Sequence, residues 1–179
     1  MTVDGVHYSR EEAHPFLTKM SSHKFGGKAG LMYELVMYTH KAKIAWLNGP
    51  FPAGNSDRIV FWNGGSKQAV EEKQLRNKDF WIIADNWYLA NDLFKLLSYR
   101  DEFDPRKFAY FKDRALARHE RMNGWSKDFG ILDHCHWSER GHNADLDFPL
   151  HKATVEVVFV VIQYELDAGE MTLFDPYPL

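Results

Sequence analysis

The stretch that most constrains the fold is 80–88, FWIIADNWY, in which a short apolar run ends directly at an aspartate. Residues 81–83 are continuously apolar, as in a buried strand, and Asn86 after them favours a turn. A carboxylate at the end of a buried strand is held by rigid backbone and can face a cleft, where a divalent metal ion can bind. The alternative is that Asp85 is a turn or helix-capping residue, and only acids elsewhere in the chain can decide between the two.

Composition predicts a single globular domain. The chain has 179 residues, of which 45% are apolar and 15% aromatic, so it can bury a core. The net charge of −3 gives no global sign of nucleic-acid binding, although a local basic patch is compatible with it. The single cysteine, Cys135, excludes an internal disulfide and suits a reducing compartment. The longest apolar run, 157–162, is too short to span a bilayer, so we expect a soluble intracellular protein with no membrane partner.

The N-terminal residues predict an incomplete strand. Thr2 and Val3 look like the tail of a strand that runs directly into Asp4-Gly5, which suggests a chain that has lost its beginning. We expect 8–23 to form a surface loop, since it is polar and irregular. The segment 22–30, SHKFGGKAG, predicts a tight basic turn, either a phosphate site or a plain hairpin connection.

A β-hairpin is predicted next. The runs 31–38, LMYELVMY, and 43–47, KIAWL, are separated by a short polar connection. Glu34 lies inside the first run, and because an acid in a strand most often faces solvent, we place it outside any site. Two glycines and two prolines make 48–55 a predicted loop.

Four helices are predicted in the rest of the chain. Asp57 opens one that ends at Gly64-Gly65, and 69–75 forms a second. After an amphipathic or irregular segment at 88–99, Asp104-Pro105 begins a third, which should end near Asn123, before Gly124. The positions of that helix expected to face the core are Phe108, Phe111, Ala115 and Met122.

The segment predicted to form the fourth helix could instead form a strand. The stretch 153–166, ATVEVVFVVIQYEL, is rich in β-branched residues, which favours a strand. Fourteen residues are long for one strand, and apolar residues on all sides suit a buried helix. We expect the helix, ended by Gly169, with 170–179 as a loose tail.

The third helix is basic. From 104 to 127 there are seven Lys or Arg residues against three acids. These cations are either a solvated face or a surface for the phosphate backbone of DNA. The candidate DNA-binding residues are Lys112, Arg114, Arg118, Arg121 and Lys127.

Three acids form a candidate catalytic set. Asp4 follows the strand remnant, Asp85 ends the buried strand, and Glu120 lies on the basic helix. Phosphodiester cleavage by two divalent ions needs such carboxylate oxygens, although a chain with 25 acids offers many triples. A zinc site at 134–136, His-Cys-His, lacks a second ligand pair, and neither GxxxxGK[ST] nor GxGxxG occurs.

The sequence resembles the catalytic domain of DDE transposases of the PIF/Harbinger type, the superfamily often described as DDE endonucleases. Nearly the whole chain is covered, in the family's order. The matching segments are VDGVHYS, SSHKFGGKAGLMYEL, WLNGPFPAGNSD, IADNWY, RALARHERMNGWSKDF and HKATVEVVFVVIQYEL.

The resemblance implies an α/β, RNase H-like fold, with a central mixed sheet flanked by helices, that cleaves DNA with two Mg²⁺ or Mn²⁺ ions. By motif, Asp4, Asp85 and Glu120 are the catalytic, metal-binding acids. The implied partners are DNA, a separate DNA-binding region or subunit and a second copy of the chain, and the implied location is the nucleus. Trp87 replaces an expected glycine and Trp125 an expected leucine, so an inactive DNA- or protein-binding remnant is the alternative.

Overall fold

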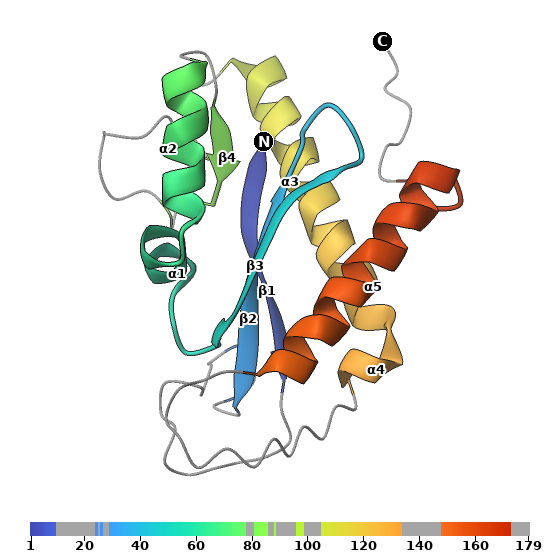
Figure 1. Ribbon diagram of the computed structural model, residues 1–179. Helices are drawn as coiled ribbons and strands as arrows, with labels where there is room; N and C mark the ends of the chain where they lie inside the picture. The colour runs from blue at the N-terminus through green and yellow to red at the C-terminus, as the bar shows by residue number, and fades with distance from the viewer. Residues whose placement is uncertain are drawn as a thin grey trace.

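The protein is organised around one mixed β-sheet with helices on both faces (Figure 1). This architecture is that of a computed structural model, which describes residues 1–9, 24, 26, 29–77, 81–85, 88, 96–98, 105–133 and 148–172. The strands are β1 (Thr2–Ser9), β2 (Gly30–Met37), β3 (Ile44–Pro52), β4 (Ile82–Ala84) and β5 (Leu96–Ser98). Their order in the sheet is β3-β2-β1-β4-β5. β2 runs antiparallel to both β1 and β3, and β4 runs parallel to both β1 and β5.

The first strand does not end at Asp4-Gly5, so the prediction of a strand reduced to its last residues was wrong. β1 runs for eight residues through Asp4 and Gly5 and pairs with β2 along its whole length. β1 lies between β2 and β4 in the sheet, and Gly5 is held in the strand by its pairing with Glu34 of β2. Tyr8 and Ser9 therefore belong to the strand rather than to the predicted loop, most of which lies outside the described residues.

The two faces of the sheet carry different cores. On one face, Val6 and Tyr8 of β1 pack with residues of the helices α3 (Arg106–Asp128) and α5 (Pro149–Ala168). On the other, Val3 packs with residues of α1 (Asp57–Asn63) and α2 (Ser66–Arg76). Because side chains alternate along a strand, Asp4 lies on the α3 face and Gly5 and His7 on the α1 face.

The hairpin was predicted correctly, but not its end. β2 and β3 form the expected antiparallel pair, whereas β3 continues to Pro52 through part of the predicted loop. β3 is the outer strand of the sheet, so its prolines remove no hydrogen bond that a further strand would need.

The predicted helices are confirmed with shifted ends. α1 and α2 lie where expected, and α5 is a helix that ends at Gly169, whose φ of 81° suits glycine. α3 continues past Gly124 to Asp128, because the burial of Asn123 and Ser126 outweighs the low helix propensity of one glycine. A short α4 (Gly130–Asp133) follows it.

Three details of the predicted elements differ. Of the residues expected to face the core from α3, Ala115 and Met122 are buried while Phe111 is 37% exposed. Residues 96–98, predicted to be amphipathic or irregular, form β5 beside β4. Trp81 lies outside β4 and is exposed. The predicted tail after 172 and the histidine–cysteine segment 134–136 lie outside the described residues.

Within the part of the chain that the structure describes, none of the helices has the length and apolar content needed to cross a membrane.

Candidate functional site

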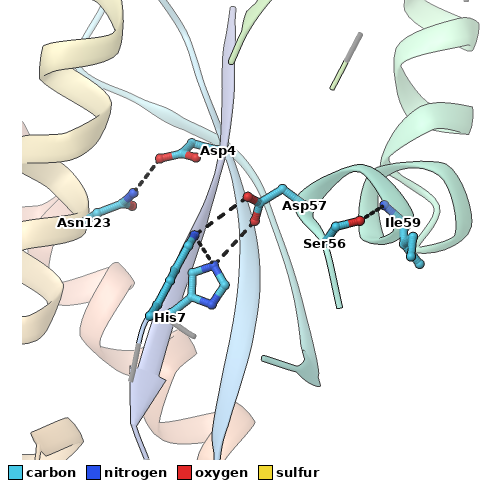
Figure 2. A network of polar contacts seen from close by, with 7 residues as sticks. Asp4, His7, Ser56, Asp57, Ile59 and Asn123 are labelled. Carbon is cyan, nitrogen blue, oxygen red and sulfur yellow. Dashed lines mark hydrogen bonds and ion pairs between the residues drawn. The ribbon is translucent and has the colours of Figure 1, made fainter. Parts of the chain in front are cut away.

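Asp4 and Asp85 lie side by side at the junction of two parallel strands. Val3 pairs with Ala84 in the β1–β4 register, so the next residue along each strand is one of these two aspartates. Figure 2 shows the Asp4 side chain directed toward α3, where the side-chain amide of Asn123 donates a hydrogen bond to Asp4 Oδ2 over 3.1 Å.

Glu120 reaches the same place from α3. A cavity of about 220 Å³ is lined by Asp4, Asp85, Glu120 and a fourth acid, Asp113. Asp113 and Glu120 are seven residues apart, two helical turns, so both lie on one stripe of α3. The structure thus brings the three predicted acids to one pocket. Asp113 was missed, although its spacing from Glu120 was a signal that could have found it.

The Asp4 carboxyl group is poorly stabilised in its ionised form. Burial raises its pKa to about 6; the nearby Asp57 and Asp85 carboxylates also raise it, while the Gly5 backbone N–H and Lys24 act in the opposite direction. The Oδ1 atom of Asn123 is buried and makes no hydrogen bond. A cation in this pocket would favour the ionised form of Asp4 and would offer the amide oxygen a partner.

The oxygen atoms in and beside the pocket are of the chemical type that binds a hard divalent ion. Carboxylate and amide oxygens are the ligands that Mg²⁺ and Mn²⁺ prefer. Among the described His, Cys, Asp and Glu residues, no three side chains are placed closely enough to hold one ion as they stand. Asp85 and Glu120 are exposed, so their side chains can rotate toward a bound ion. When no cation lies between them, the like charges of the carboxylates favour separated side chains.

The predicted basic surface is not formed as a whole. Lys112 is 1% exposed and Arg118 8% exposed, because both lie on the side of α3 that packs on the protein. Arg118 donates a hydrogen bond to the Thr39 carbonyl oxygen over 2.9 Å, which is a structural role. These two residues are therefore corrected from DNA contacts to interior cations.

The other three candidates remain at or near the surface. Arg114 donates a hydrogen bond to the Tyr110 hydroxyl over 2.9 Å, and Arg121 donates one to the Thr172 carbonyl oxygen over 3.3 Å. Lys127 lies in the exposed last turn of α3. Of the five candidate residues, these three therefore keep side chains that a ligand could reach.

A second polar cluster lies behind Asp4, on the α1 face of the sheet. His7 Nε2 is 3.4 Å from Asp57 Oδ1 (Figure 2). Lys24 Nζ is 2.7 Å from His7 Nε2 and 3.7 Å from Asp57 Oδ2. Although burial raises the pKa of Asp57, the hydrogen bond from His7 and the charge of Lys24 outweigh it and leave the pKa below its ordinary value. Asp57 is thus held ionised against the back of β1.

Glu34 belongs to this cluster, and its predicted solvent position was wrong. It pairs with Gly5 across the β1–β2 ladder and is 0% exposed. All eight residues of β2 are buried, because helices cover both faces of the sheet there, so strand alternation does not bring this acid to water. Burial raises its pKa to about 7, with the Asp57 charge adding to the shift and the Ser66 hydroxyl opposing it.

Gly5 makes room for Asp57, and Gly5→Ala is expected to destabilise the fold by about 2 kcal/mol. An added Cβ would lie 2.3 Å from Asp57 Oδ1, so the carboxylate would have to leave His7. Urea unfolding of Gly5→Ala, Asp57→Ala and the double variant measures the effect. If the clash is the cause, the two single losses will not add; full additivity would contradict it.

Comparisons of the chain with models of protein families, with curated proteins and with solved structures each found no match.

Proposed function

We propose that this chain is the RNase H-like catalytic domain of a metal-dependent DNA endonuclease or transposase of the DDE type. The observation that supports this most is the common pocket of Asp4, Asp85 and Glu120, three acids that come from separate elements of the fold. The mixed sheet with helices on both faces is consistent with such a fold. The order of the matching sequence segments supports the same proposal.

In this proposal Asp4, Asp85 and Glu120 hold two Mg²⁺ or Mn²⁺ ions. When bound, such ions activate a water or a DNA 3′-hydroxyl and stabilise the oxygen that leaves phosphorus. Asn123 fixes one oxygen of Asp4 by its hydrogen bond, which orients the carboxylate. Asp113 adds a fourth negative charge to the pocket wall and strengthens its attraction for cations.

Metal removal tests the proposal directly. We expect the purified chain to nick supercoiled plasmid DNA in Mg²⁺ or Mn²⁺ and to lose this activity in excess EDTA, with recovery when Mn²⁺ is restored. The conversion of supercoiled to open-circular DNA on agarose gels measures the rate. Nicking that persists at full rate in EDTA would contradict the proposal.

The alternative is a remnant that keeps the fold and binds DNA or protein without cutting. The tryptophans at positions 87 and 125, where the family's motifs have glycine and leucine, favour this alternative. It would be supported if the folded chain shifts labelled DNA in a binding assay but leaves plasmid DNA intact in both Mg²⁺ and Mn²⁺.

A further inference from the structure

The polar cluster behind β1 contains buried oxygen atoms without hydrogen-bond partners. Both carboxylate oxygens of Glu34, the hydroxyl of Ser66 and the hydroxyl of Tyr88 are buried and unpaired. The three residues are between 0% and 1% exposed. Buried polar atoms of this kind each cost free energy unless a partner is present, so several in one place indicate a missing ligand.

These atoms come from β2, from the start of α2 and from Tyr88, which follows β4, and the Asp57 carboxylate of α1 lies among them. Glu34 is the cross-strand partner of Gly5 and therefore projects on the same face of the sheet. The Asp57 carboxylate lies where a Gly5 side chain would stand, so the two carboxyl groups are neighbours. Ser66, at the start of α2, is close enough to Glu34 to oppose its pKa shift, although no full hydrogen bond joins them.

Tyr88 closes the cluster from the β4 side. Its ring packs edge-on against Phe61 of α1, with ring centroids 5.8 Å apart. Burial raises the pKa of the Tyr88 hydroxyl well above its ordinary value, and the neighbouring carboxylates, Asp57 first among them, raise it further. The hydroxyl therefore stays neutral and can offer a lone pair to a cation.

Charge balance indicates which ligand would fit. Asp57 is already compensated by Lys24, whose Nζ lies 3.7 Å from Oδ2. When Glu34 is ionised, the carboxylates of Glu34 and Asp57 and the ammonium group of Lys24 sum to one negative charge. One positive charge would neutralise it, whereas a divalent ion would leave a buried excess of +1. Oxygen-only donors select a hard ion over zinc or copper.

We infer that Glu34 and Asp57, with the hydroxyls of Ser66 and Tyr88, form a buried site for one monovalent alkali cation, Na⁺ or K⁺, on the face of the sheet opposite the acid pocket. The bound ion would join β2, the N-terminal ends of α1 and α2, and Tyr88, which follows β4. This inference does not depend on the proposed nuclease function, because none of its ligands lines the acid pocket.

Thermal unfolding in different salts tests the inference. At pH 8, the chain is placed in choline chloride, which is then replaced by NaCl or KCl at constant ionic strength. We expect the unfolding midpoint to rise by about 3–5 °C with at least one of the two ions and to saturate with its concentration. Equal midpoints in choline, Na⁺ and K⁺ would overturn the inference.

Variants identify where the ion binds. Glu34→Gln should lose the shift, while Asp85→Asn, which alters the acid pocket, should keep it. If Glu34→Gln does not fold, Ser66→Ala retains both carboxylates and should raise the half-saturating salt concentration several-fold. The assignment would be contradicted if Ser66→Ala and Glu34→Gln both kept the full rise in unfolding midpoint at an unchanged half-saturating salt concentration. It would also be contradicted if Asp85→Asn alone lost that rise.

Discussion

Asp85→Asn is expected to reduce Mn²⁺-dependent nicking of plasmid DNA at least about 100-fold while leaving the fold intact. The substitution removes one negative charge and keeps the size of the side chain, so the pocket would bind and orient divalent ions less well. Asp85 is exposed at the end of β4, and its replacement disturbs no core packing. Initial nicking rates at saturating Mn²⁺ measure the effect, and circular dichroism checks the fold.

The matched control is Asp128→Asn. It makes the same chemical change in the exposed last turn of α3, outside the pocket, and should cut at the parent rate. Glu120→Gln should behave like Asp85→Asn, because both acids line the pocket. If Asp85→Asn cuts as fast as Asp128→Asn, the assigned site is wrong.

Glu34→Gln is expected to stabilise the chain at pH 8 by about 3 kcal/mol in choline chloride, where no alkali cation is present. The pKa of Glu34 rises from 4.5 to about 7 on folding, and each pKa unit corresponds to about 1.4 kcal/mol. Because the folded-state pKa is the higher one, the contribution of Glu34 to stability is fully present below pH 4.5 and is lost as the pH rises through about 7. Glutamine has no charge to bury and avoids this loss.

Urea unfolding of parent and variant at pH 4.5, 6 and 8 checks this prediction. The difference in unfolding free energy should be small at pH 4.5 and grow with pH. Glu72→Gln, on the exposed side of α2, is the matched control for removing a carboxylate without burial. A difference between Glu34→Gln and the parent that stays constant from pH 4.5 to 8 would show that Glu34 does not titrate as described.

Local patterns were sufficient for much of the fold. The β2–β3 hairpin follows from alternating runs with a short polar connection, and α1 and α2 follow from the aspartate and glycines around them. The choice of a helix for α5 was correct, but the burial expected from its all-round apolar character was not, because Val157, Val160 and Tyr164 are exposed. The strand ending at Asp85 was predicted from its apolar run.

Features set by contacts between distant segments could not be predicted. Glu34 looks like a surface acid until helices on both sides of β2 are known. β1 was predicted to be short because a glycine in a strand suggests a break, whereas pairing with β2 along its whole length continues the strand through Gly5. The burial of Lys112 and Arg118 depends on how α3 is rotated on the sheet, which a charge count does not specify.

The sequence predicted that Asp4, Asp85 and Glu120 lie together, but not that Asp113 and Asn123 lie beside them. Spacing along the sequence leaves Asp4 and Asp85 unrelated, and only the parallel register of β1 and β4 makes them neighbours. Asp113 joins them through the helical period of α3, and Asn123 through its hydrogen bond to Asp4.

The missing side chain of Gly5 has a consequence for how this protein can evolve. A single layer of backbone separates the Asp57 carboxylate from the side of the strand that carries Asp4, and such a layer contains no mobile ions to damp an electric field. Substitutions at position 57 would therefore alter the electrostatic potential at Asp4 from the opposite face of the sheet. Substitutions at positions 4 and 57 should therefore be correlated in related sequences, although the two side chains lie on opposite faces of the sheet.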